Sequence, residues 1–319
     1  MEAMKRKKIL ITGATGFVGS CLLHSLLNDG FSNISIIIRK SSNIWRIKNI
    51  LNKIKVCYSD LLDLERLKKV VLEIRPEIIF HLATYGAYPA FQKDIKKMYE
   101  INLFGLINLL TVSAKVEFEC FINTGSSSEY GKKKEPMVET NLLEPNSDYE
   151  VSKACATLYC QNFAKQNDLP IVTLRLFSPY GYYEDRNRLI PYVILSCLSG
   201  RNPKLSSPNS VRDFIFIEDV IESYIKVINS QNIGGQIFNI GSSKQYSIAE
   251  VVSTIIKITD EKLKPNWNSV FNPRSEPDMW IADTSKAKSV LNWFPRCDLE
   301  EGLRKNIKWF KKNLYLYKT

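Results

Sequence analysis

Short apolar runs alternate with amphipathic segments over the first 176 residues of this 319-residue chain. The apolar runs have the length of strands, and the segments between them carry apolar residues at helical spacing. Such alternation implies right-handed βαβ units and a parallel sheet that helices cover on both faces. It therefore predicts an α/β fold with a doubly wound parallel sheet. The expected strands are 8–12, 34–38, 54–58, 78–82, 120–123 and 171–176, and the expected helices are 17–29, 64–74, 95–116 and 148–166.

The pattern becomes less regular and richer in proline and turn residues after about residue 177. We expect residues 177–212 and 242–319 to build a smaller C-terminal α/β lobe over the carboxyl ends of the strands, where open α/β sheets bind ligands. Residues 213–217 and 236–240 resemble strands that return to the main sheet. The predicted organisation is thus a main domain of residues 1–176, completed by strands within 213–241, and a substrate-binding lobe.

Charge and composition exclude several classes of function. The formal charge is +11, but the basic residues are spread along the chain without a basic arm or a nucleic-acid-binding motif. The surplus indicates a lysine-rich surface or a field that attracts an anionic substrate. With only His24 and His81 present, a histidine-based metal site is not expected. The irregularly spaced cysteines and the lack of a long apolar stretch predict a cytoplasmic protein with reduced thiols and no membrane span.

A glycine-rich segment joins the first expected strand to the first expected helix. Gly13, Gly16 and Gly19 have the spacing GxxGxxG. Glycines at these positions permit a tight turn and let backbone amides approach a pyrophosphate, and the helix N-terminus adds a positive dipole end. The segment predicts a dinucleotide-binding Rossmann domain at the start of the chain.

Arg39 stands at the end of the second expected strand, where a site that prefers NAD usually carries an acidic residue. A guanidinium suits the 2′-phosphate of NADP, and Ser41 could join the same phosphate pocket. The alternative is that Arg39 lies in a solvated turn and binds no phosphate. Asp60, just past the third strand, is placed to meet the adenine edge of the cofactor or to cap a helix. The predicted cofactor is therefore NADP(H), with NAD as the alternative.

Tyr149 and Lys153 are four residues apart in an expected helix, so they share one of its faces. A tyrosine hydroxyl has a pKa of about 10, and a neighbouring ammonium lowers that pKa. Ser126, after the fifth strand, can hydrogen-bond a substrate oxygen. Tyr149 can then pass a proton to or from that oxygen while hydride moves to or from the nicotinamide. These residues form a predicted catalytic trio of an NAD(P)-dependent enzyme.

Further motifs of the chain occur in the order known from one enzyme family. They are GATGFVG (13–19), FHLA (80–83), NLFG (102–105), SSSEYG (126–131), YEVSK (149–153), RLFSPYG (175–181), RDFIFIEDV (212–220) and ADTSKA (282–287). Over nearly its whole length the chain resembles the extended short-chain dehydrogenases/reductases of the nucleotide-sugar epimerase, dehydratase and reductase branch. The resemblance implies a nucleoside-diphosphate sugar as substrate. It also implies a homodimer in which the helices 95–116 and 148–166 pair with those of a second copy.

The same resemblance implies roles for single residues. Lys153 would bind the nicotinamide ribose, and Arg212 and Arg274 would clamp the diphosphate of the sugar nucleotide, a ligand that suits bidentate arginine. Asn102 would lie near the active site or serve the fold. The other implied cofactor contacts are Thr15, Phe17, Val18, Leu61, Leu82, Ala83 and Pro179. The other implied substrate contacts are Tyr85, Ser127, Ser128 and Ser178.

Some positions depart from the family and bear on the reaction. Many relatives carry Asn where this chain has Ser178, and that Asn often contacts substrate phosphate. Relatives that dehydrate sugars carry an acidic residue directly after the Ser or Thr of the trio, where this chain has Ser127 and Ser128. Glu129 follows one residue later and should point elsewhere.

These departures, together with Arg39, favour NADPH-dependent reduction of the C4 keto group of a nucleoside-diphospho-4-keto-6-deoxy sugar, a reaction of deoxysugar biosynthesis. The alternative is an NAD-dependent nucleotide-sugar epimerase that returns its hydride to the sugar. A third reading is a regulator that senses NAD(P) without turnover. The nucleobase, the sugar and the product stereochemistry stay open.

Overall fold

The computed structural model describes residues 2–87, 92–259, 262–270 and 278–317. Their contacts divide the chain into two units, each assembled from separate segments. The first unit contains Met1–Gly131, Leu142–Leu176 and Ser223–Phe238. The second contains Lys132–Asn141, Phe177–Glu222 and Asn239–Thr319.

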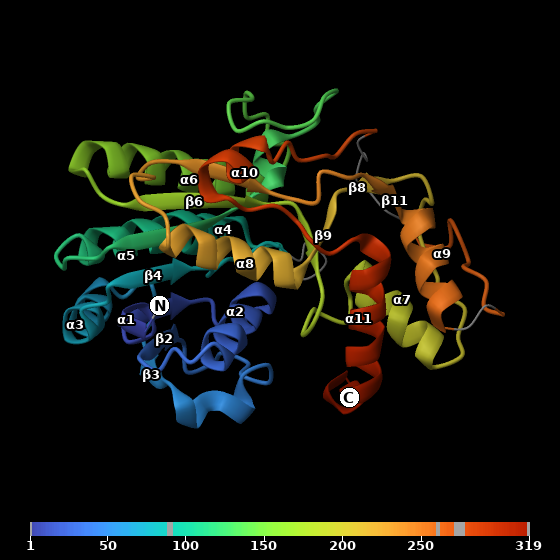
Figure 1. Ribbon diagram of the computed structural model, residues 1–319, viewed down its shortest axis with the longest axis horizontal. Coiled ribbons are helices and arrows are strands. Elements are labelled where there is room, and N and C mark those ends of the chain that lie inside the picture. Colours follow the sequence, from blue (N-terminus) through green and yellow to red (C-terminus); the bar gives the residue numbers. More distant parts are fainter. Residues whose placement is uncertain (1, 88–91, 260–261, 271–277, 318–319) are drawn as a thin grey trace. The chain divides into compact units, whose positions relative to one another are not determined.

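A seven-stranded parallel sheet forms the main sheet (Figure 1). Its strand order reverses between β1 and β4, because β1 pairs with β2 on one side and with β4 on the other. The predicted doubly wound sheet is therefore confirmed, and its crevice lies at the carboxyl ends of β1 and β4. In spatial order the strands are β10 (Ile237–Ile240), β6 (Ile171–Leu176), β5 (Cys120–Ser126), β4 (Ile78–His81), β1 (Ile9–Thr12), β2 (Ile34–Ile38) and β3 (Lys55–Tyr58).

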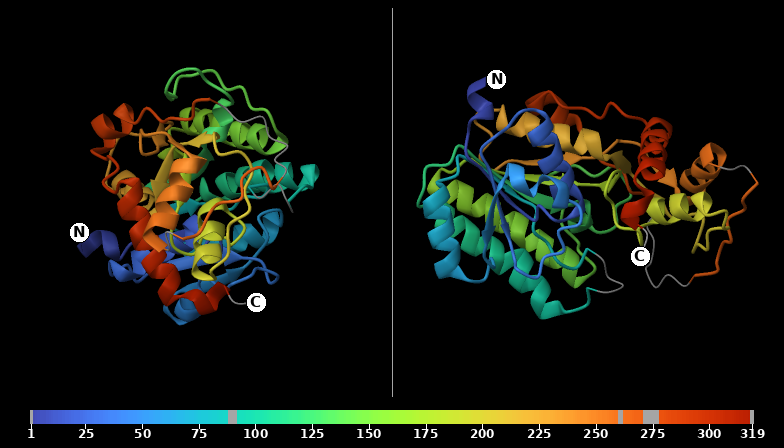
Figure 2. Two further views of the ribbon diagram at one scale, coloured as in Figure 1. Left: turned by 90° about the vertical axis from the view of Figure 1, so that its right-hand side faces the viewer. Right: turned by 90° about the horizontal axis from the view of Figure 1, so that it is seen from below.

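Helices cover both faces of this sheet, which explains why β1, β2, β4 and β6 are buried along their whole length and mostly apolar. On one face, α3, α5 and α6 bury a core that includes Leu67, Leu109 and Cys160 against the strands. The right-hand view of Figure 2 shows α2 and α8 along the opposite side. The helical segments up to residue 176 are α1 (Glu2–Lys5), α2 (Phe17–Asn28), η1 (Lys48–Lys53), α3 (Leu64–Ile74), α4 (Ile95–Tyr99), η2 (Glu100–Phe104), α5 (Gly105–Ser113), η3 (Ser127–Tyr130) and α6 (Asp148–Asn167).

The expected helix 95–116 is interrupted rather than uniform. Residues Glu100–Phe104 form a π-helical segment between α4 and α5. Such segments are rare in helices and are frequent at functional sites. Here the segment carries Asn102, whose side chain is buried and bonded to neighbouring elements.

In the second unit, α7, α9 and α11 pack on one another, and two short sheets pair β7 with β9 and β8 with β11. Its elements are β7 (Ser178–Tyr180), α7 (Leu189–Leu198), β8 (Val211–Arg212), β9 (Phe214–Phe216), β11 (Tyr246–Ser247), α9 (Ile248–Thr259), α10 (Ser285–Leu291), α11 (Leu299–Lys312) and η4 (Leu314–Tyr317). Helix α8 (Ile217–Ile228) begins in this unit and ends in the first.

The expectation that residues 213–217 return to the main sheet is wrong. β9 pairs with β7 instead, in parallel, with Pro179 opposite Ile215. The position beside β6 in the main sheet is taken by β10, as expected for residues 236–240. β9 is only three residues long and leads directly into α8. Among the described residues, no helix is long and apolar enough to cross a membrane.

Candidate active site

The glycine-rich loop lies at the crevice of the main sheet, between β1 and α2. Gly13 adopts a φ of +74°, and a Cβ added there would lie 2.4 Å from the Leu82 carbonyl carbon and 2.5 Å from the Ala83 nitrogen. A Cβ on Gly19 would lie 2.2 Å from the Gly13 oxygen, and the Gly16 N–H donates to that oxygen at 3.0 Å. Side chains are therefore excluded at Gly13 and Gly19, and the segment after β4 packs directly on the loop. This backbone cradle fits a dinucleotide pyrophosphate.

A buried arginine in the segment after β2 donates a hydrogen bond to the glycine-rich loop. Arg46 is 9% exposed, and its Nη1 donates to the Thr15 carbonyl oxygen at 3.2 Å. Its guanidinium lies 4.4 Å from the centroid of the Trp45 ring. Phe17 and Val18 begin α2 directly after the loop. Sequence reasoning missed Arg46, although a second arginine shortly after the second strand was a signal that could have found it.

Arg39 and Ser41 are both exposed in the turn that follows β2. The Arg39 N–H donates to the Ser42 Oγ at 3.1 Å, which forms a tight turn at the end of the strand. β2 neighbours β1, so this turn and the glycine-rich loop follow adjacent strands. The arrangement places Arg39 at the edge expected to hold an adenosine ribose.

Asp60 and Leu61 follow β3. The Asp60 Oδ1 accepts the Leu62 N–H at 3.0 Å, and Asp63, not Asp60, caps α3. The Leu61 carbonyl oxygen accepts the Asn108 Nδ2–H at 2.9 Å, which ties this loop to α5.

Ser126 is the last residue of β5 and the N-cap of η3. Its Oγ lies 2.8 Å from the Ser128 Oγ and accepts the Ser128 N–H, while its own N–H donates to the Glu129 Oε1 at 2.7 Å. This capping box fixes Ser126 at the carboxyl end of the strand. Ser127 is buried and Ser128 is half-buried.

Helix α6 brings Lys153 to the strand that carries Ser126. Ser147 caps the helix two residues before Tyr149, and the helix packs against β5 and η3. The buried Lys153 ammonium donates to the Thr124 carbonyl oxygen at 2.5 Å. Tyr149 lies one turn before Lys153 on the same face, with its ring beside Gly86. Ser126, Tyr149 and Lys153 therefore all lie in the first unit.

Two buried polar side chains serve the fold around the trio. The Asn102 Oδ1 accepts the Tyr85 N–H at 2.8 Å, and its Nδ2 donates to the Tyr85 oxygen and to the Ser152 Oγ. Asn102 therefore holds the predicted substrate contact Tyr85 against α6. His81 bonds to the Thr12 Oγ1 at 2.8 Å, and burial lowers the pKa of His81 to about 3. The imidazole is accordingly neutral near pH 7.

The predicted cofactor contact Pro179 and the predicted substrate contacts Ser178 and Arg212 lie in the second unit. Ser178 and Pro179 begin β7, and the Ser178 N–H donates to the Asp213 oxygen at 3.0 Å. The Arg212 Nη1 donates to the Val211 oxygen, and the guanidinium lies 5.5 Å from the Trp280 ring centroid. Arg274 lies outside the described residues.

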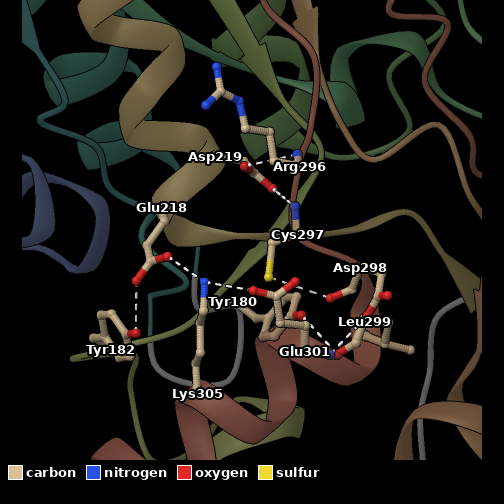
Figure 3. A network of polar contacts seen from close by, with 10 residues as sticks. All are labelled: Tyr180, Tyr182, Glu218, Asp219, Arg296, Cys297, Asp298, Leu299, Glu301 and Lys305. Carbon is tan, nitrogen blue, oxygen red and sulfur yellow. Dashed lines mark hydrogen bonds and ion pairs between the residues drawn. The ribbon is translucent and has the colours of Figure 1, made fainter.

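A polar network anchors β7 within the second unit (Figure 3). The Tyr182 hydroxyl donates to Glu218, and the Lys305 ammonium contacts both Glu218 and Glu301 at 3.0 Å. The buried Tyr180 hydroxyl, next to Pro179, donates to the Leu299 oxygen at 3.3 Å. Hydrogen bonds to the two glutamates raise the pKa of Lys305, so its charge persists at neutral pH.

Comparison with known proteins agrees with this geometry. The model of the NAD dependent epimerase/dehydratase family matches residues 9–241. The chain belongs to this family. The resemblance to extended short-chain dehydrogenases/reductases that the motifs indicated is thereby confirmed.

Members of this epimerase/dehydratase family resemble the chain along nearly its whole length. A dTDP-D-glucose 4,6-dehydratase of Homo sapiens is 26% identical and aligns with 98% of this chain and 92% of its own length. A UDP-glucose 4-epimerase of Pisum sativum is 28% identical over 98% of this chain and 97% of its own. The crystal structure of UDP-glucuronic acid 4-epimerase from Bacillus cereus, in complex with UDP-glucuronic acid and NAD, is 28% identical. It has a TM-score of 0.85 and covers 96% of this chain and 99% of its own.

Proposed function

We propose that the chain is an NAD(P)-dependent oxidoreductase that acts on a nucleotide sugar. The observation that carries the proposal is the arrangement in one unit: the glycine-rich loop follows β1, and Ser126 and Lys153 meet at the end of β5, which β4 separates from β1 in the same sheet. The structure of the related Bacillus cereus epimerase holds NAD and UDP-glucuronic acid together. We also propose that the protein works in the cytoplasm as a homodimer.

The glycine-rich loop and the trio have different proposed roles in the reaction. Gly13, Gly16 and Gly19 would hold the pyrophosphate of the dinucleotide, which when bound supplies or accepts the hydride. Ser126 hydrogen-bonds the reacting sugar oxygen, and Tyr149 gives a proton to that oxygen or takes one from it. The Lys153 ammonium favours the phenolate of Tyr149 and therefore eases the proton transfer.

The specific reaction we propose is reduction of a 4-keto group by NADPH. C4 of a nucleoside-diphospho-4-keto-6-deoxy sugar gains hydride, and its oxygen gains a proton from Tyr149. The exposed Arg39 at the end of β2 supports NADPH, because no carboxylate stands there to repel a 2′-phosphate. Ser127 and Ser128 in place of an acidic residue speak against dehydration, because elimination of water needs a further acid and base.

The second candidate is epimerisation with a retained NAD. It is favoured by relatives such as the Bacillus cereus epimerase, whose structure holds NAD. An epimerase needs the same trio, so the catalytic residues do not separate the two reactions.

Cofactor consumption separates the two candidates. Purified enzyme is incubated with dTDP- or UDP-4-keto-6-deoxyglucose and NADPH, with Tyr149→Phe as the inactive control. We expect one NADPH oxidised for each sugar, whose mass increases by one hydride and one proton. Interconversion of two nucleotide sugars without added cofactor, by enzyme that co-purifies with NAD, would instead establish the epimerase.

A further inference from the structure

Two buried side chains, those of Lys153 and Glu129, bond to backbone groups of β5. The Thr124 carbonyl oxygen accepts the Lys153 ammonium at 2.5 Å, and the Ser126 N–H donates to the Glu129 Oε1 at 2.7 Å. Gly125 lies between these two residues, and a Cβ added to it would be 2.9 Å from the same Glu129 oxygen. The carboxylate and the ammonium are therefore held on neighbouring backbone groups of one strand.

Glu129 is built into the fold rather than attached to its surface. Its exposure is 0%, and its second oxygen, Oε2, accepts the Arg175 Nε–H at 2.7 Å. The Arg175 guanidinium, itself 2% exposed, lies 4.6 Å from the Tyr130 ring centroid. A buried carboxylate is retained only where other groups compensate it. Here one oxygen holds Ser126 and the other is held by Arg175.

We propose that Glu129 is a positioning residue of the active site, which fixes Ser126 at the end of β5 and keeps Lys153 in its ammonium form. The inference rests on the roles proposed above for Ser126 and Lys153. A neutral amine would no longer favour the Tyr149 phenolate, so proton transfer depends on a negative charge near Lys153.

The surroundings of Lys153 contain few other charges. Burial lowers the pKa of Lys153, and the negative charge of Glu129 raises it. Burial lowers the pKa of His81 on β4 to about 3 and raises that of Cys160 on α6 to about 12, so both are neutral near pH 7. On the other face of the sheet, burial raises the pKa of Tyr224 on α8. Among the described groups, Glu129 has the largest effect that raises the pKa of Lys153.

The Glu129→Gln variant tests the charge while keeping an oxygen that can accept the Ser126 N–H. The titration of Lys153 is followed by NMR in protein that carries lysine labelled with ¹³C at Cε, and Lys153→Arg identifies its resonance. We expect the Lys153 midpoint to fall by about one pH unit or more in Glu129→Gln, as for loss of a close opposite charge. The matched control is Glu73→Gln, which breaks the surface pair with Lys55 and leaves that midpoint unchanged.

Activity gives an independent reading of the same variant. The alkaline limb of the pH profile of kcat should move to lower pH in Glu129→Gln, whereas a residue that serves only the fold would lower kcat without moving the limb. A folded Glu129→Gln protein with the wild-type Lys153 midpoint would overturn the inference.

Glu129→Gln removes the carboxylate that pairs with the buried Arg175 guanidinium, and this loss can prevent the variant from folding. The double variant Glu129→Gln/Arg175→Gln removes both charges and should show the same direction of change for Lys153. Unfolding of both variants would assign Glu129 to the fold alone and overturn its role at Lys153. The NMR titration needs no substrate, so a wild-type enzyme that fails to turn over nucleotide sugars would overturn the proposed function and leave this inference standing.

Discussion

The proposed role of Tyr149 depends on its hydroxyl oxygen. The Tyr149→Phe substitution removes this atom and leaves the glycine-rich loop unchanged. We expect Tyr149→Phe to lower kcat by at least a factor of about 10² to 10⁴, the usual contribution of a positioned proton donor. The dissociation constant of the cofactor should stay close to the wild-type value, as measured by calorimetry. Tyr315→Phe, which alters an exposed tyrosine, should change neither quantity. A near-normal kcat in Tyr149→Phe would contradict the assignment.

Arg39 determines the choice of cofactor in our proposal. A charge-assisted hydrogen bond contributes about 1.5–3 kcal/mol, which corresponds to roughly a tenfold to hundredfold preference. We therefore expect wild-type enzyme to bind NADPH at least tenfold more tightly than NADH, and Arg39→Ala to remove most of this difference. Fluorescence titration with both cofactors measures it, with Arg6→Ala at the N-terminus as the control. Equal affinities in the wild type would refute the role of Arg39.

Glu129 shows what a sequence can and cannot predict at the scale of residues. Positions of Ser126, Tyr149 and Lys153 followed from local spacing, since each lies at the end of a strand or on one face of a helix. The sequence predicted that Glu129 points away from the site, but its Oε1 accepts the Ser126 N–H while its Oε2 accepts the Arg175 Nε–H. What spacing could not predict is that the capping box returns that side chain to the Ser126 N–H, because the turn and its distant arginine partner depend on tertiary packing.

At the scale of elements, the packing of the loop between β1 and α2 depends on glycine at Gly13 and Gly19, where a Cβ would clash with the backbone. We expect Gly19→Ala to weaken cofactor binding at least tenfold, because the added Cβ would lie 2.2 Å from the Gly13 oxygen and would push α2 away from β1. Calorimetry with the cofactor measures this loss. Gly200→Ala is the control, since a Cβ there meets nothing within 4 Å although its φ of +64° brings some strain. Normal cofactor affinity in Gly19→Ala would contradict the role of the cradle.

Elements with strong periodicity were predicted with nearly the observed bounds, as for α3 (Leu64–Ile74) and β6 (Ile171–Leu176). Residues 213–217 have a strand-like pattern as well, but pairing decides which sheet a strand joins, and β10 occupies the place beside β6. The π-helical turn at Glu100–Phe104 has the composition of an ordinary helix, so its sequence gave no signal for it.

At the scale of the whole molecule, exposed apolar side chains support a homodimer. Ile95, Phe104 and Leu158 are each more than half exposed and belong to α4, η2 and α6, which pack on one another. A second copy would cover this face. We expect light scattering to give the mass of a dimer at micromolar concentration and Leu158→Glu to give a monomer. The control is Leu142→Glu, which alters an exposed loop residue, and a monomeric wild type would refute the proposal.

The late position of β10 in the chain has a consequence for biosynthesis. β6 is complete at Leu176, but its neighbour β10 begins only at Ile237. A ribosome that adds about 5–20 residues per second leaves the edge of β6 unpaired for several seconds on every nascent chain. Unpaired edges are templates for aggregation, so slow translation or a pause within residues 177–236 should make newly made chains more dependent on chaperones.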